Sequence, residues 1–246
     1  MKRSIGVAVS QVLVLVGVAI TGTMSPADAR GLTPPKTGAI PVAFVLTEGS
    51  TVIDFAGPWE VFQDVMVPSR GSSHDEQMPF QLYTVGDSPT AITASGGLKI
   101  VPDYSFDTAP KPRIVVVGAQ RGSEKLTAWL KKVAADPETD VVMSVCTGAF
   151  KLAGAGLLDG KAATTHHDFL DRFAQQYPKV KLQRGLRFVE SDAHTFTAGG
   201  LTSGIDLALH VVELYFGTPT AEQTARYMEY QGGGWRAPRA EAGREP

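Results

Sequence analysis

The sequence contains only one cysteine, Cys146, among its 246 residues. No disulfide can form within the chain, and the stability of the fold must come from its hydrophobic core. A lone thiol is either buried as a small apolar side chain or kept for its reactivity. The choice between these two interpretations depends on the residues around Cys146.

Sequence patterns typical of nucleic-acid, cofactor and metal binding are absent as well. Lys and Arg number 23 against 25 Asp and Glu, which gives a net charge of −2. A basic surface for nucleic acid is therefore not expected. The chain has no glycine-rich phosphate loop, no dinucleotide-binding fingerprint and no spacing typical of metal ligands. We expect neither a cofactor nor a metal, and the expected partner is a small-molecule substrate.

The first 29 residues have the order of a secretory signal peptide. Lys2 and Arg3 precede an apolar run over residues 5–20, and the small-residue site Ala27-Asp28-Ala29 follows. We expect cleavage after Ala29 and a secreted or periplasmic protein. Retention as a signal anchor is the alternative, because the run is near the shortest length that spans a bilayer. No other stretch is apolar and long enough to cross a membrane.

The rest of the chain is expected to form a linker (residues 30–39), one domain (40–231) and a flexible tail rich in Gly, Arg and Pro (232–246). Along the domain, short apolar runs typical of buried strands alternate with helical segments. The clearest strands are expected over residues 40–46, 80–85, 113–117, 141–145 and 195–198. This alternation predicts an α/β fold with a doubly wound, mainly parallel sheet and helices on both faces.

Cys146 lies where one of these strands gives way to a helix. A Val-rich run over residues 141–145 precedes it, and the small residues Thr147, Gly148 and Ala149 follow it. A strand that turns sharply into a helix presents the residue at the turn above the sheet edge, with its side chain exposed. The N-terminus of the helix offers free N–H groups and a positive dipole end, which favour a thiolate. The pattern favours a nucleophilic cysteine at a nucleophile elbow.

Ligands of parallel sheets bind at the carboxyl ends of the strands. This rule brings together three loops, over residues 48–58, 118–122 and 146–148. The first loop carries Asp54 ahead of a helix that we expect to begin at Pro58, since proline suits a first helical turn. Asp54 is either a functional carboxyl group or a loop residue that bonds its own backbone.

Four motifs of the chain occur together in a known family. They are IDFAGPWEVF at residues 53–62, SVCTGA at 144–149, ATTH at 163–166 and AGGLTSGIDLALH at 198–210. In order and spacing they resemble the ThiJ/PfpI superfamily, which has a flavodoxin-like fold of the class I glutamine-amidotransferase type. The most similar branch contains isonitrile hydratases and the amidase-like domains of AraC-type regulators. The resemblance covers residues 40–230.

The resemblance implies roles for individual residues. Cys146 matches the nucleophile, and Asp54 matches the acidic residue that bonds the thiol and acts as a general acid in isonitrile hydratases. The backbone N–H groups of Gly118, Ala119 and Thr147 match an oxyanion or substrate-binding pocket. Many relatives have Gly-Gly where this chain has Gly118 and Ala119, so a positive φ at the alanine would be strained.

The chain also departs from parts of the superfamily. Protease-like members have a histidine directly after the nucleophile, where this chain has Thr147, and no His-x-Glu motif follows Thr195. A Cys–His–acid triad is therefore not expected. His166 ends a strand and either lines the pocket or is a structural histidine. Little sequence follows Tyr230, so a DNA-binding module is not expected.

The resemblance implies a cysteine-dependent lyase or hydrolase that adds water to an isonitrile and releases an N-substituted formamide, and the signal-peptide pattern implies that this enzyme is exported. Two alternatives share the same fold. One is a redox-responsive or ligand-binding protein without catalysis, and the other is a glyoxalase-like or amidase-like enzyme. Superfamily members are often dimers, so the resemblance suggests a homodimer.

Overall fold

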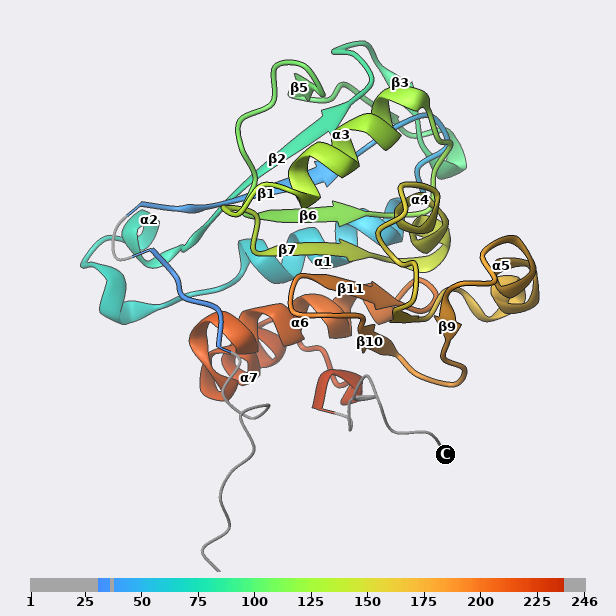
Figure 1. Cartoon of the computed structure of the whole chain (residues 1–246). Coiled ribbons are helices and arrows are strands. Elements are labelled where there is room, and N and C mark those ends of the chain that lie inside the picture. Colours follow the sequence, from blue (N-terminus) through green and yellow to red (C-terminus); the bar gives the residue numbers. More distant parts are fainter. Residues whose placement is uncertain (1–30, 36–37, 237–246) are drawn as a thin grey trace, which may run out of the picture. The chain divides into compact units, whose positions relative to one another are not determined.

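The computed structural model of the chain describes residues 31–35 and 38–236 (Figure 1). The expected signal peptide over residues 1–29 and part of the expected linker lie outside these described residues and stay predictions. Among the described residues, none of the helices combines the length and the apolar character that a membrane span requires.

A seven-stranded sheet lies at the centre of the domain, with the strand order β10-β11-β7-β6-β1-β2-β5 (Figure 1). Its strands are β1 (Ile40–Val45), β2 (Phe80–Gly86), β5 (Tyr104–Ser105), β6 (Ile114–Val117), β7 (Val141–Ser144), β10 (Phe188–Glu190) and β11 (Thr195–Ala198). All neighbouring strands are parallel except β10 and β11, which are antiparallel. The mainly parallel sheet predicted from the alternation is confirmed.

The middle strands are apolar along their whole length because both faces of the sheet are covered. All four residues of β6 and all four of β7 are buried. A strand buried on both faces gives a continuous apolar run instead of an alternating one. The two strands pair in register from Ile114 opposite Val141 to Val117 opposite Ser144. This register places their carboxyl ends side by side at one edge of the sheet.

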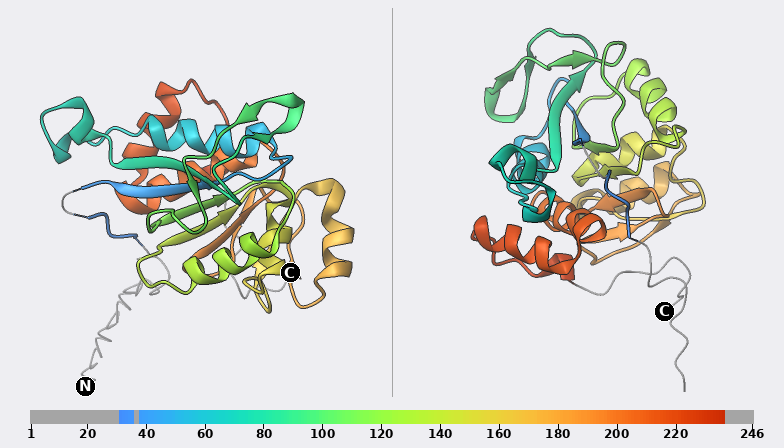
Figure 2. Two further views of the ribbon diagram at one scale, coloured as in Figure 1. Left: turned by 90° about the horizontal axis from the view of Figure 1, so that it is seen from above. Right: turned by 90° about the vertical axis from the view of Figure 1, so that its left-hand side faces the viewer.

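Helices cover both faces of the sheet (Figure 2). They are α1 (Val52–Gln63), α2 (His74–Gln77), α3 (Glu124–Ala134), α4 (Ala149–Gly154), α5 (Leu170–Gln176), α6 (Ser203–Phe216) and α7 (Thr218–Tyr227). One hydrophobic core takes its helical side chains from α1, α6 and α7, and a second takes them from α3, α4 and α5. The doubly wound, flavodoxin-like arrangement is therefore the observed one.

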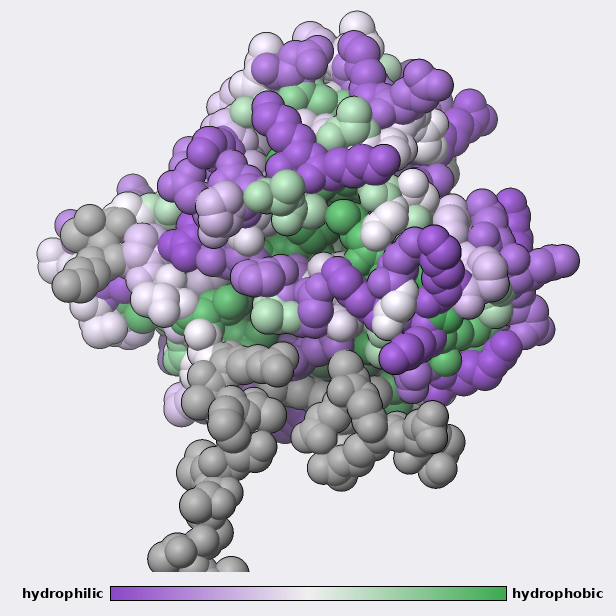
Figure 3. Space-filling view, in the orientation of Figure 1, coloured by the Kyte–Doolittle hydropathy of each residue, from purple (hydrophilic) through white to green (hydrophobic). Residues whose placement is uncertain are grey.

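Short elements connect these layers. β3 (Ile92–Thr93) and β4 (Lys99–Ile100) form an antiparallel hairpin, while β8 (Ala162–Ala163) and β9 (Lys181–Leu182) form a parallel pair outside the main sheet. The 3-10 turns are η2 (Pro68–Arg70), η3 (Ser95–Gly97), η4 (Cys146–Gly148), η5 (His167–Phe169) and η6 (Gly234–Arg236). Hydrophobic surface on the face drawn in Figure 3 lies in small areas bordered by hydrophilic side chains.

The helix expected to begin at Pro58 begins six residues earlier, at Val52, so that prediction is wrong. Pro58 lies inside α1, where its missing N–H leaves the carbonyl of Asp54 without the usual helical donor. Burial of the helix outweighs this loss, since Val61 and Phe62 are among the least exposed core residues. Asp54 therefore lies in the first helical turn and not in a loop.

The flexible tail was expected to begin at residue 232, but residues just after this position are packed on the domain. Trp235 is 1% exposed and belongs to the core that contains α6. Its backbone N–H donates to the buried carboxylate of Asp206, which also accepts from the Tyr230 hydroxyl at 3.1 Å. The ordered domain thus extends at least to Arg236. The composition of residues 232–246 hid this because a single buried tryptophan anchors a segment of glycines.

Candidate active site

Cys146 is held at a sharp turn between β7 and α4. It has a φ of 57°, in the left-handed region that few residues other than glycine adopt. The N–H of Cys146 donates to the carbonyl of Gly199 at 2.8 Å, and its own carbonyl accepts from the Thr165 hydroxyl at 2.9 Å. These bonds fix the strained conformation from both sides. The strand, turn and helix of the predicted elbow are therefore present.

Gly148 lets this turn pack against the neighbouring strand. A Cβ atom at this position would lie 2.0 Å from the carbonyl oxygen of Val117 at the end of β6. Any larger residue would have to push the elbow away from the sheet edge. The close approach brings the Cys146 turn next to the loop that follows β6.

The Cys146 side chain is buried, with 6% of the residue exposed, and not exposed as the elbow pattern predicted. Burial raises the pKa of the thiol to about 11, with the Asp54 carboxylate as the next cause, and the N–H groups of Thr147 and Leu201 act in the opposite direction. The N–H groups at the turn thus favour a thiolate, as expected, but the thiol keeps its proton at neutral pH. The reason is that desolvation and a neighbouring anion outweigh two N–H donors.

Asp54 lies beside Cys146 and is completely buried. Its Oδ2 accepts from the N–H of Ala119 at 2.9 Å, while its Oδ1 has no well-formed hydrogen bond within the described residues. Burial raises the pKa of Asp54 to about 6, whereas the Ala119 N–H and the Cys146 thiol lower it. A thiol that donates toward a carboxylate has this effect, because it stabilises the ionised carboxyl group.

These shifts define the protonation state of the pair. At neutral pH the proton resides on sulfur and the Asp54 carboxyl is mostly ionised, since its pKa is about 6 and that of the thiol is about 11. Such a pair can transfer the proton as sulfur attacks a substrate, because the acceptor is already in contact. The unpartnered Oδ1 is free to hold a substrate proton or a water molecule.

Two of the three backbone N–H groups expected to bind substrate, those of Thr147 and Ala119, act on the thiol and on the carboxyl group instead. The Thr147 N–H interacts with the Cys146 sulfur. The Ala119 N–H is occupied by Asp54, so it orients the carboxyl group. Ala119 is not among the described residues of positive φ, and the predicted strain does not arise.

Gly118 matters for its lack of a side chain. A Cβ atom here would lie 2.8 Å from the Cβ of Asp54. The glycine therefore allows α1 to bring its carboxyl group against the end of β6. The three loops over residues 48–58, 118–122 and 146–148 do meet, as the sheet topology predicted.

Leu201 is a site residue that the sequence did not single out, and its N–H lowers the pKa of the Cys146 thiol. Leu201 has a φ of 52°, another left-handed residue. Arg187 supports this loop, since its guanidinium donates to the Thr202 hydroxyl at 3.1 Å and pairs with buried Asp206 at 2.5 Å. The sequence signal for Leu201 is the motif AGGLTSG, in which it lies, but the resemblance assigns no role to this residue.

His166 packs on the same loop. A Cβ atom on Gly200 would lie 2.4 Å from the His166 ring, so the ring lies directly against this glycine. The Nδ1 of His166 accepts from the Asp168 N–H at 3.2 Å, and the ring stacks on His167. The structure thus places His166 against the loop that carries Leu201, and no hydrogen bond between His166 and Cys146 is present among the described residues.

His166, His167 and Asp168 also form the one described group of three potential metal ligands that lie close together. Their ligand atoms lie within 4.8 Å of one another, and His167 and Asp168 are exposed. The Nδ1 of His166 is already an acceptor for backbone N–H, which leaves fewer free ligand atoms than the count suggests. Cys146 and Asp54 are the stronger candidates for the functional site, because both are buried and each shifts the pKa of the other.

The sequence of this chain is similar to those of known proteins over most of the domain. The DJ-1/PfpI family matches residues 41–214 of the chain. Isonitrile hydratase from Pseudomonas putida is 29% identical over 201 residues, which cover 78% of this chain and 79% of that protein. The transcriptional regulator GbdR from Pseudomonas aeruginosa is 28% identical over 190 residues, which cover 75% of this chain and 49% of the regulator.

Solved structures are similar in the same region. A ThiJ/PfpI family protein from Pseudomonas syringae has a TM-score of 0.64 and 27% identity, covering 85% of this chain and 81% of its own. DJ-1beta from Drosophila melanogaster has a TM-score of 0.62 and 16% identity, covering 79% and 100% of the two chains. At this lower identity the likeness concerns the fold alone.

Proposed function

Because the chain belongs to the DJ-1/PfpI family, we propose that it is a cysteine-dependent enzyme that adds water to an isonitrile and releases an N-substituted formamide. The observation that carries this proposal is the buried pair of the Cys146 thiol and the Asp54 carboxylate. The similarity to an isonitrile hydratase over most of both chains supports the choice of substrate.

In the first step the Cys146 sulfur bonds to the terminal carbon of the isonitrile. The thiol proton passes to the Asp54 carboxylate and from there to the same carbon, which gives a thioimidate. Because the thiol pKa is about 11, free thiolate is scarce and attack must be coupled to this proton transfer. The Asp54 carboxyl, with a pKa of about 6, is suited to accept the proton and release it again.

In the second step water adds to the thioimidate carbon. Asp54 takes a proton from the water and passes it to the nitrogen, so that the carbon carries a hydroxyl group, the nitrogen and the sulfur. The carbon–sulfur bond then breaks as the hydroxyl proton passes through Asp54 to sulfur, and the formamide leaves. The N–H groups of Thr147 and Leu201, which interact with the sulfur, stabilise the charge that develops as it departs.

The test is turnover of an alkyl isonitrile by the purified chain, followed by the appearance of the formamide. The Cys146→Ala variant should show no turnover above the uncatalysed rate. Equal activity of wild type and variant would overturn the catalytic role of the thiol. Absence of activity in the folded wild type would overturn the isonitrile as substrate.

The redox-responsive alternative has less support. Oxidation to sulfenic or sulfinic acid proceeds through the thiolate, which the raised pKa of Cys146 makes scarce. Intact mass after low doses of peroxide separates the two functions, because a redox-responsive protein should gain oxygen at Cys146 first.

Export remains part of our proposal, and the mass of the mature protein after expression would reveal cleavage after Ala29.

A further inference from the structure

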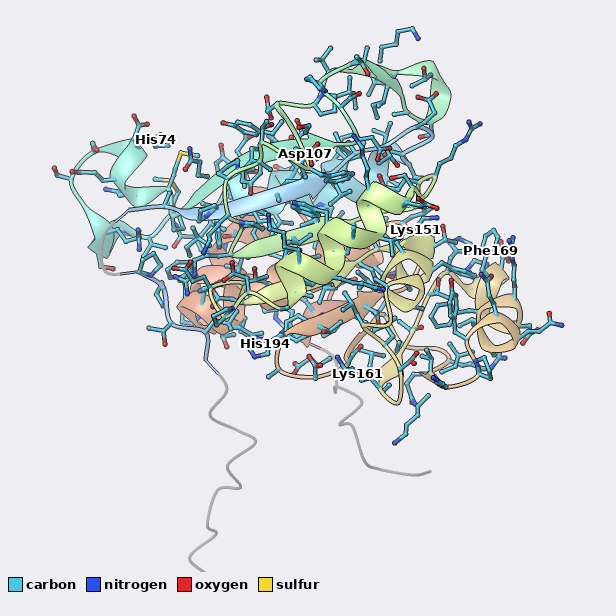
Figure 4. The ribbon with its side chains drawn as sticks, turned by 45° about the horizontal axis from the view of Figure 1, so that its top comes forward. His74, Asp107, Lys151, Lys161, Phe169 and His194 are labelled. Carbon is cyan, nitrogen blue, oxygen red and sulfur yellow. The ribbon has the colours of Figure 1, made fainter. Side chains whose placement is uncertain are left out.

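A pocket of about 260 Å³ lies between α4 and α5, beside the elbow. Thr147, whose N–H interacts with the Cys146 sulfur, forms part of its wall. Figure 4 labels Lys151 on α4 and Phe169 at the end of η5, directly before α5, on adjacent segments of the molecule. The pocket is lined mainly by Thr147, Phe150, Lys151, Phe169, Arg172 and Tyr177.

Two cations of this pocket lack an acidic partner. Neither Lys151 nor Arg172 forms an ion pair or a side-chain hydrogen bond within the part of the chain that the structure describes. The nearest acid in sequence, Asp171, pairs with Arg184 instead, at 2.5 Å. Burial lowers the pKa of Lys151, and the charge of Arg172 lowers it further. Lys151 is half-buried and Arg172 is exposed, so the pocket places a partly desolvated ammonium beside a second positive charge. An anion bound between the two groups would offset their repulsion.

Aromatic side chains form the remaining walls. Phe150 packs edge-on against Phe169, with ring centres 6.5 Å apart, and against Tyr177 at 5.9 Å. The Arg172 guanidinium lies 5.9 Å from the centre of the Phe150 ring. The Phe150 ring thus contacts the Arg172 guanidinium, and the aromatic side chains give the pocket an apolar surface next to its positive charge.

We propose that this pocket binds a small organic carboxylate, with its carboxylate group between Lys151 and Arg172 and its apolar body against the aromatic walls. A guanidinium and an ammonium together match the two oxygens of a carboxylate. Inorganic phosphate would satisfy the charges but leave the rings without a partner. The volume also suits a ligand with an apolar body, since small-molecule sites begin near this size.

This binding site does not depend on the proposed catalysis, because none of its charged groups takes part in the reaction. Binding should therefore persist in the Cys146→Ala variant. A ligand that contacts Thr147 lies one residue from the nucleophile, so the same carboxylate should also change the rate at which iodoacetamide alkylates Cys146 in the wild-type chain.

Calorimetric titration of the full chain with benzoate tests the proposal, with benzamide as the neutral analogue and inorganic phosphate as the anion without a ring. We expect benzoate to bind at least about tenfold more tightly than either. Lys151→Met, which keeps the aliphatic length, and Arg172→Gln should each weaken benzoate binding by roughly tenfold or more. The matched control is Lys132→Met, an exposed lysine on α3 outside the pocket lining.

Equal binding of benzoate and benzamide would overturn the proposal, as would unchanged benzoate binding in a folded Lys151→Met protein. Tighter binding of phosphate than of benzoate would show a general anion site and contradict the organic carboxylate. Loss of binding in Lys132→Met to the same degree would show that only net charge matters, which would also overturn it.

Discussion

The Asp54 carboxylate raises the pKa of the Cys146 thiol, while the Cys146 thiol lowers the pKa of Asp54. The two effects have the same origin, because both favour a state in which sulfur keeps the proton and the carboxyl group is ionised. Burial acts on both groups and is the largest cause for each. The nucleophile is thus stored in its protonated form, next to the group that removes the proton.

Replacing Asp54 by Asn should lower the thiol pKa and yet lower the activity. Loss of the carboxylate removes a cause that raises the pKa of Cys146, but it also removes the proton acceptor. We expect turnover of the isonitrile to fall by about 10²–10⁴-fold. Iodoacetamide alkylation of Cys146 across a pH series measures the thiol pKa in both proteins. Unchanged turnover in the variant would contradict the role of Asp54.

The same substitution should stabilise the fold at neutral pH. The folded state raises the pKa of Asp54 from 3.8 to about 6, so it binds more protons than the unfolded state between these values. Stability therefore falls as the pH rises through this window, and above it the ionised, buried carboxyl costs about 1–3 kcal/mol. Asp54→Asn should raise the free energy of unfolding by a similar amount at pH 7.5.

Urea unfolding at two pH values checks this expectation. The difference between wild type and variant should shrink near pH 4, where the carboxyl is protonated in the folded protein and close to half protonated in the unfolded one. A variant that is less stable than wild type at pH 7.5 would mean that the Ala119 N–H bond outweighs the burial of the charge.

Thr202 should affect the thiol although it does not contact it. Its hydroxyl accepts from Arg187 at 3.1 Å and so fixes the loop in which the Leu201 N–H faces the sulfur. Thr202→Val removes this bond at an exposed position, so we expect little loss of stability. A loosened Leu201 N–H should raise the thiol pKa and reduce turnover severalfold.

The pH dependence of alkylation distinguishes this positioning effect from a general loss of structure. Thr220→Val is the matched control, because the Thr220 hydroxyl bonds the Phe216 carbonyl between α6 and α7, away from the elbow. Equal alkylation profiles for wild type and Thr202→Val would contradict the proposal that Thr202 and Arg187 position the Leu201 N–H.

Much of the fold was accessible from the sequence because its signals are local. The apolar runs of β6 and β7 depend only on nearby residues. The meeting of the three loops follows from the rule that ligands of parallel sheets bind at the carboxyl ends of the strands. The pairing of Cys146 with Asp54 came from the family resemblance.

The remaining features depend on contacts that no local pattern contains. The start of α1 at Val52 reflects packing of a helix that tolerates Pro58, against the preference of proline for a first turn. The raised thiol pKa depends on burial, which the elbow pattern does not report. The Leu201 N–H faces the sulfur only because Arg187 and His166 support its loop from other elements.

Trp235 should be a major source of stability although it lies near the end of the described chain. It is 1% exposed, and its backbone N–H donates to the buried Asp206 carboxylate, which also accepts from Arg187 and Tyr230. Trp235→Ala leaves a cavity in this core and should lower the free energy of unfolding by about 3–5 kcal/mol. Urea unfolding measures the change. The matched control is Tyr227→Ala, an aromatic truncation on α7 at a residue 74% exposed, which should change stability by less than about 0.5 kcal/mol. Similar effects of the two substitutions would contradict the anchoring of residues 232–236 to α6.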